Sequence, residues 1–168
     1  MTQGIGFVEG RDYSFEGFSI RLGGLTLVPT GLVYPELRGR EGQIIGVNVI
    51  IATDRFHGEH IFDFPISVFK RMHADLAELA SGNLDRLIIP ATMWFMDPFV
   101  CECLIEHPPW SHLQWQVHVR LSNCQWPQDR GTYALIETRF SIGSDTIAIA
   151  RDDTADFLRW LSSMDATA

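Results

Sequence analysis

The sequence predicts an α+β fold that is mainly antiparallel β-sheet, sandwich-like or strongly curved, with two amphipathic helices. The strongest sign of sheet is the segment from His112 to Leu121, where large apolar residues alternate with polar ones without interruption. Because successive side chains of a strand point to opposite faces, this pattern indicates a strand with one buried and one solvated face. Helices are indicated where the apolar spacing changes to three and four residues, at about 66–81 and 152–164. The 168 residues, 46% of them hydrophobic, fit a single domain, 1–168, with its own core.

Short strands are expected in the first third of the chain, where glycines separate small apolar segments. Apolar and polar residues alternate on both sides of Gly23-Gly24, a dipeptide that permits the tight turn of a hairpin. A surface loop is expected at 32–42, followed by two strands at 43–52 and 57–62 that a turn at 54–56 connects.

The first helix follows a change of period at Asp63-Phe64-Pro65. Ile66, Phe69, Met72 or His73, Leu76 and Leu79 recur at three- and four-residue intervals, with charged residues between them. Asp63 is expected to accept backbone N–H groups near the helix start, where a proline is tolerated. Gly82 is expected to end the helix in the left-handed conformation.

The second half of the chain predicts more sheet and a closing helix. In the segment 99–106, Cys101, Cys103 and Ile105 share the face that we expect to be buried. Asp152 and Asp153 are expected to open the last helix, with Phe157, Leu158, Leu161 and Met164 on one face. The remaining expectations are strands at 86–90, 112–121, 134–142 and 147–149, a loop or edge at 107–110 and a polar connection at 122–131.

The net charge of −8 restricts the classes of partner. An acidic surface repels phosphate backbones and anionic lipids, so we expect no binding to nucleic acid or membrane and a better fit to a basic partner. The simpler alternative is that this charge only keeps a small domain soluble. The apolar runs fall short of a membrane span, and the first ten residues do not resemble a secretory signal. With three cysteines that form no regular pattern, these features predict a cytoplasmic protein with reduced thiols.

Catalytic and metal-binding patterns are weak in this sequence. Cys101 and Cys103 lack the second ligand pair of a zinc site, and buried thiols are the simpler interpretation. His57 and His60 would point to opposite faces of a strand, whereas His112 and His118 would share its polar face. No serine or cysteine stands in a recognisable nucleophile motif, and no glycine pair in the context of a phosphate loop. We therefore expect neither an enzyme nor a cofactor or metal.

Two tryptophans beside prolines are the best candidates for partner binding. Trp110 follows Pro108-Pro109 and Trp126 precedes Pro127, and aromatic residues on rigid loops are favoured interface anchors. The alternative is that both rings are buried against their own core. The residues expected on the partner-binding surface are Trp110, His112, Trp126, Asp129, Glu102 and Glu106.

The order of elements resembles the WapI-like immunity proteins of bacterial polymorphic toxin systems. The resemblance rests on Phe18-Ser19-Ile20 before a glycine turn, on Val47-Asn48-Val49 before Phe56-x-Gly58, on a helix from Phe69 to Leu79 that ends in Ser81-Gly82, and on the helix from Asp153 to Leu161. It implies a non-enzymatic inhibitor that binds a cognate toxin and blocks its active site. A toxin with a basic groove, such as a nuclease, would suit the acidic charge.

Two other hypotheses remain open. One is a small-ligand-binding protein or enzyme with a pocket between sheet and helices, lined by His112, His118 or Glu102. The other is a homo-oligomeric structural protein, so that monomer and homodimer are both possible states. The leading expectation is an immunity protein that occludes its toxin with an acidic and aromatic surface.

Overall fold

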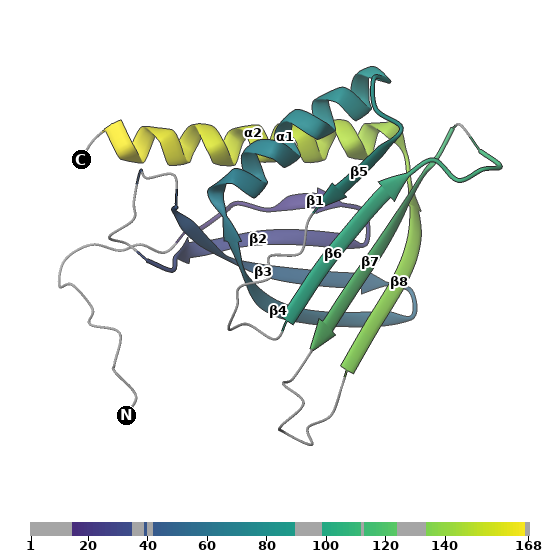
Figure 1. Ribbon diagram of the computed structural model, residues 1–168, viewed down its shortest axis with the longest axis horizontal. Helices are drawn as coiled ribbons and strands as arrows, with labels where there is room; N and C mark the ends of the chain where they lie inside the picture. Colours follow the sequence, from purple (N-terminus) through teal and green to yellow (C-terminus); the bar gives the residue numbers. More distant parts are fainter. Residues whose placement is uncertain are drawn as a thin grey trace.

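In the computed structural model, the described residues form two antiparallel four-stranded sheets and two helices, which confirms the α+β class (Figure 1). The structure describes residues 15–34, 39, 42–89, 99–111, 113–123 and 134–166. The first sheet has the order β1 (Ile20–Leu22), β2 (Leu25–Leu32), β3 (Ile44–Thr53) and β4 (Phe56–Pro65). The second has the order β5 (Arg86–Ile89), β6 (Phe99–Glu106), β7 (Trp115–Asn123) and β8 (Ala134–Ile142). The helices are α1 (Ile66–Ser81) and α2 (Ser144–Ala166).

The first sheet confirms the predicted hairpin and the two strands after it. Leu22 pairs with Leu25 across the two-glycine turn, in which Gly23 has a positive φ of 66°. β3 is the centre of the buried face, because its alternate residues Ile45, Val47, Val49 and Ile51 are fully buried. β4 is longer than the expected 57–62 and continues directly into α1.

The second sheet confirms the predicted buried face of β6 and corrects the start of β7. Cys103 and Ile105 are buried, as expected for that face of the strand. β7 begins at Trp115, so that Leu113 lies before the strand and is exposed rather than in the core. The alternation in the sequence therefore starts before the sheet pairing does. β6 ends at Glu106, opposite Gln116, and β8 ends at Ile142, opposite Trp115, so neither neighbouring strand extends beyond Trp115.

Helix α1 has the predicted buried face and the predicted end. Its buried residues are Ile66, Phe69, Met72, Leu76 and Leu79. Gly82 is left-handed with φ 78°, and its N–H donates to Leu79 O at 3.1 Å. Asp63 is not the N-cap residue: it lies in β4, and the N-cap residue is Pro65, which makes no side-chain cap hydrogen bond. Because β4 runs straight into the helix, the Ile66 N–H instead donates to Gln43 O at 2.9 Å.

Helix α2 corrects the prediction for the last third of the chain. The expected short strand at 147–149 does not form, since the helix begins at Ser144 and continues past the expected start at Asp152. Alternation in Ile-Ala-Ile suggested a strand, but a longer spacing of three and four residues determines the buried face. The buried residues of α2 are Ile147, Ala150, Thr154, Phe157 and Leu161.

One hydrophobic core joins both sheets to both helices. The strands of the second sheet cross those of the first at a steep angle, and the helices lie together at one end of the sheets (Figure 1). Phe157 of α2 contacts Phe69 of α1, with ring centroids 5.1 Å apart. The same ring contacts Phe15 and Phe18, which precede β1. None of the helices in the described residues is long and apolar enough to cross a bilayer.

Candidate functional site

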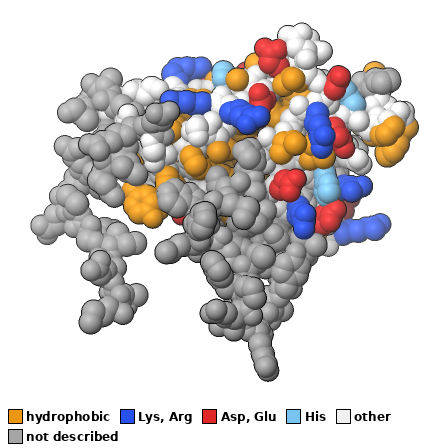
Figure 2. Space-filling view, in the orientation of Figure 1, with side chains coloured by type: hydrophobic (Ala, Val, Ile, Leu, Met, Phe, Trp, Pro, Cys, Tyr) orange, Lys and Arg blue, Asp and Glu red, His pale blue; other side chains and the backbone are white. Residues whose placement is uncertain are grey.

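The outer face of the second sheet collects polar side chains from four strands. The strand register aligns them in rows across the sheet, so that Glu102 lies beside Arg120 and Arg120 beside Glu137. Figure 2 shows acidic, basic and histidine side chains interleaved where Figure 1 places β6, β7 and β8. This outer face comprises Arg86, Ile88, Glu102, Leu104, Glu106, Gln116, His118, Arg120, Glu137, Arg139 and Ser141.

The charges on this outer face are balanced rather than acidic. His118 Nε2 lies 2.6 Å from Glu137 Oε1, and Arg139 Nη2 lies 3.7 Å from the same oxygen. Glu106 Oε2 lies 3.7 Å from Arg86 Nε. Since each carboxylate has a cationic neighbour, such a surface favours a partner with mixed charges over one that is uniformly basic.

The loop between β6 and β7 presents two large apolar side chains to solvent. Trp110 is 78% exposed and Leu113 is 87% exposed, and we call this pair the apolar loop tip. Figure 2 shows hydrophobic side chains at the right-hand edge of the molecule, where Figure 1 places this loop. The loop follows Glu106 directly, so the apolar loop tip borders the outer face of the second sheet.

Several contacts tie the described residues of this loop to one another and to the start of β7. The His107 ring stacks on Trp115, with centroids 3.5 Å apart and planes at 27°. His107 Nδ1 lies 3.1 Å from Gln114 O, on the opposite side of the loop. The Ser111 N–H donates to Pro108 O at 3.1 Å and closes a turn next to Trp110. A constrained loop loses less conformational entropy on binding than a flexible one.

A groove of about 760 Å³ lies between the two sheets at the free side of β8. One wall is the turn 52–56 between β3 and β4, and the other is formed by β8 residues 137–141. A pocket between sheet and helices was expected for a ligand-binding protein, whereas this groove is bordered by strands and a turn. Neither His118 nor Glu102 lines it, and His112 lies outside the described residues.

The distribution of potential metal ligands and thiols can be followed in the residues that the structure describes. In this part of the chain no three His, Cys, Asp or Glu side chains gather into a group that could hold a metal ion. Cys103 is buried in the core, as the sequence predicted, and the Cys101 side chain lies outside the description.

The expected partner-binding residues fall into two groups. Trp110, Glu102 and Glu106 lie on the apolar loop tip and the adjoining outer face, whereas His112, Trp126 and Asp129 lie outside the described residues. Leu113 was missed because its alternation with polar neighbours suggested a core position. Searches against protein-family models, curated proteins and solved structures find no match for this chain.

Proposed function

We propose that this protein is an immunity protein that binds a cognate bacterial toxin and neutralises it by covering the active site. The observation that carries the proposal is the apolar loop tip, where Trp110 and Leu113 are exposed on a constrained loop. Large apolar side chains that stay exposed on a rigid support are typical anchors of protein interfaces, where tryptophan is enriched among the residues that dominate affinity.

The surroundings of the apolar loop tip suit a protein partner. A typical interface has an apolar centre and a polar rim. Here the outer face of the second sheet would supply polar contacts beside the anchors, with Glu106 and Arg86 next to the loop and Glu102 further along β6. The net charge of −8 would accelerate encounter with a basic toxin such as a nuclease, and this acceleration would fall as salt rises.

The resemblance to WapI-like immunity proteins is the second support for this proposal. It supplies the biological role, whereas the apolar loop tip supplies a means of binding. Both lead to the same experiment, which is coexpression with a toxin encoded beside this gene, followed by a pull-down at moderate salt.

The contribution of the loop is tested with Trp110→Ala and Leu113→Ser. Because both side chains are solvent-exposed, we expect unchanged unfolding curves and a loss of affinity of about 2 kcal/mol for Trp110→Ala, roughly 30-fold. Ile149→Ala is the matched control, since Ile149 is an exposed apolar residue of α2 and not part of the loop. Equal toxin binding and equal protection of cells by all three variants would contradict the proposed role of the loop.

A further inference from the structure

Strand β8 is the outer strand of the second sheet, and the groove follows it closely. Five consecutive residues, 137–141, line the groove. Consecutive residues of a strand point alternately to its two faces, so a groove lined by all of them runs along the strand's edge and not over one face. Within the described chain β8 pairs with β7 alone, which leaves the other edge of its backbone facing this groove.

The opposite wall gives the groove its shape and part of its charge. The turn 52–56 carries Asp54 and Arg55, which are both exposed, and Phe56, which is half-buried. Phe140 lies close to Gly24 at the inner side of the groove. A five-residue strand is about 17 Å long, so the groove is the length of an ordinary short strand.

We propose that this groove binds an extended segment of a partner protein, which adds to the second sheet as a fifth strand beside β8. Main-chain hydrogen bonds to a free strand edge give affinity in this mode of recognition, and alternate side chains give specificity. The inference depends on β8 and the turn 52–56, not on the apolar loop tip, so it stands or fails separately from the toxin-binding role.

The charges on β8 specify the kind of segment that fits. Glu137 and Arg139 lie two residues apart on the outer face, with Thr138 between them on the other face. An antiparallel segment places an acidic residue opposite Arg139, a β-branched residue opposite Thr138 and a basic residue opposite Glu137. The ligand is therefore an extended segment in which an acidic, a β-branched and a basic residue follow one another.

A foreign segment fits this groove better than a second copy of the chain. Each copy carries its own turn 52–56 against the same edge of β8. If two β8 strands paired symmetrically, both copies of the turn 52–56 would lie near the symmetry axis. Each turn would then occupy the space that β8 of the other copy needs. A single extended segment fills the groove without this conflict.

A peptide with the sequence of β8 itself, Ala134–Ile142, is a suitable probe. Its Glu-Thr-Arg run matches the acidic, β-branched and basic pattern when it pairs antiparallel with β8. We expect the labelled peptide to bind the full chain, with NMR shifts that concentrate at the amides of 137–141 and of the turn 52–56. The matched control exchanges the peptide's Glu and Arg, which places like charges opposite each other and should weaken binding at least about fivefold.

The protein variant Glu137→Arg/Arg139→Glu provides the reciprocal measurement. It should prefer the exchanged peptide, whereas Trp110→Ala should bind both peptides as the unmodified protein does. Equal affinity for the two peptides, or shifts that fall outside the groove, would overturn the proposal. A stable dimer whose β8 amides are already protected without peptide would overturn it as well, because the occupant would then be a second copy.

Discussion

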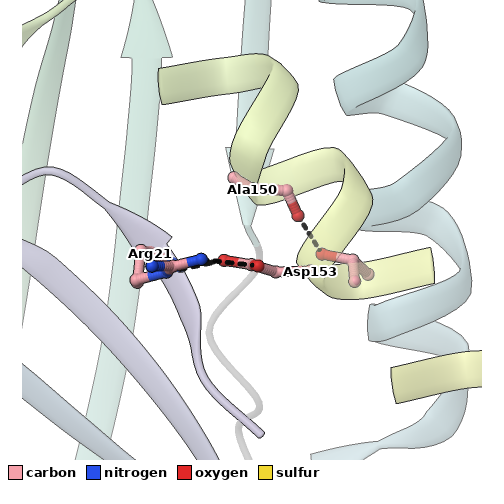
Figure 3. A network of polar contacts seen from close by, with 4 residues as sticks. Arg21, Ala150 and Asp153 are labelled. Carbon is pink, nitrogen blue, oxygen red and sulfur yellow. Dashed lines mark hydrogen bonds and ion pairs between the residues drawn. The ribbon is translucent and has the colours of Figure 1, made fainter. Parts of the chain in front are cut away.

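Arg21 of β1 and Asp153 of α2 form a two-point ion pair that fastens the long helix to the outer strand of the first sheet (Figure 3). Arg21 Nε and Nη2 each lie 3.0 Å from one carboxylate oxygen, and the Arg21 backbone N–H donates to Oδ2 at 3.3 Å. The hydrogen bond to Asp153 and its negative charge raise the pKa of Arg21. Asp153 therefore accepts a hydrogen bond from a backbone N–H at the outer edge of β1, which would otherwise be open to another chain.

Removing this carboxylate should weaken the attachment of α2. We expect Asp153→Asn to lower the melting temperature, because the amide keeps the size of the side chain but not the charge that Arg21 meets. Asp156→Asn is the matched control, since the partner of Asp156 among the described residues is Arg159, one turn away on the same exposed helix surface. Thermal unfolding followed by circular dichroism compares the two, and equal melting temperatures would contradict this role of Asp153.

The turn between β1 and β2 should not accept a side chain. A Cβ at Gly23 would lie 2.7 Å from Ile142 Cγ2, and the positive φ of 66° adds backbone strain. We expect Gly23→Ala to lower the free energy of unfolding by about 2–4 kcal/mol in urea titrations. Gly17→Ala isolates the strain, because Gly17 has φ 83° and no atom near its Cβ position, and should cost about 1 kcal/mol. If both variants lose the same amount, the contact with β8 is unimportant.

Phe157 should be among the most sensitive positions of the core. Its ring is fully buried and contacts Phe15, Phe18 and Phe69 at centroid distances of 5.8, 5.5 and 5.1 Å. Phe157→Ala is expected to lower the free energy of unfolding by about 3–5 kcal/mol, through lost burial and a cavity. Phe157→Leu keeps an apolar side chain and should cost about 1–2 kcal/mol. A loss below 1 kcal/mol for the alanine variant would show that the aromatic cluster is not tightly packed.

Because residues 144–151 are helical, Ile147 and Ile149 should differ in how much they contribute to stability, whereas in a strand they would not. Ile147 is fully buried and Ile149 is 44% exposed. We expect Ile147→Ala to destabilise the protein by about 2–4 kcal/mol and Ile149→Ala by less than about 0.5 kcal/mol. Both positions would share one face of a strand, so similar losses in chemical denaturation would favour the strand instead.

Most of the fold can be predicted from local patterns in the sequence, and the errors in that prediction also have local causes. The two-glycine hairpin, the strand near 43–52 and the helix that ends at Gly82 each combine a clear period with a turn former. The Ile-Ala-Ile segment misled because three residues are too few to distinguish alternation from the face of a longer helix. Asp63 is not the N-cap residue because β4 continues through it to Pro65, directly before α1.

The candidate site was less predictable than the fold. Proline neighbours made the exposure of Trp110 foreseeable, since a rigid loop outside a strand holds its side chains away from the core. The groove beside β8 depends on the approach of residues 52–56 to 137–141, which lie more than eighty positions apart. No periodicity in the local sequence indicates that these two segments lie close together, because their approach results from the packing angle of the two sheets.

Because α2 follows all eight strands that the structure describes, its place in the core has a consequence during synthesis. Ribosomes add about 5–20 residues per second, so the early hairpins emerge several seconds before the helix that shields them. Nascent chains halted before residue 144 would display bare aliphatic surface and attract chaperones or proteases. Chains long enough to include α2 would escape this recognition, because the helix covers that surface.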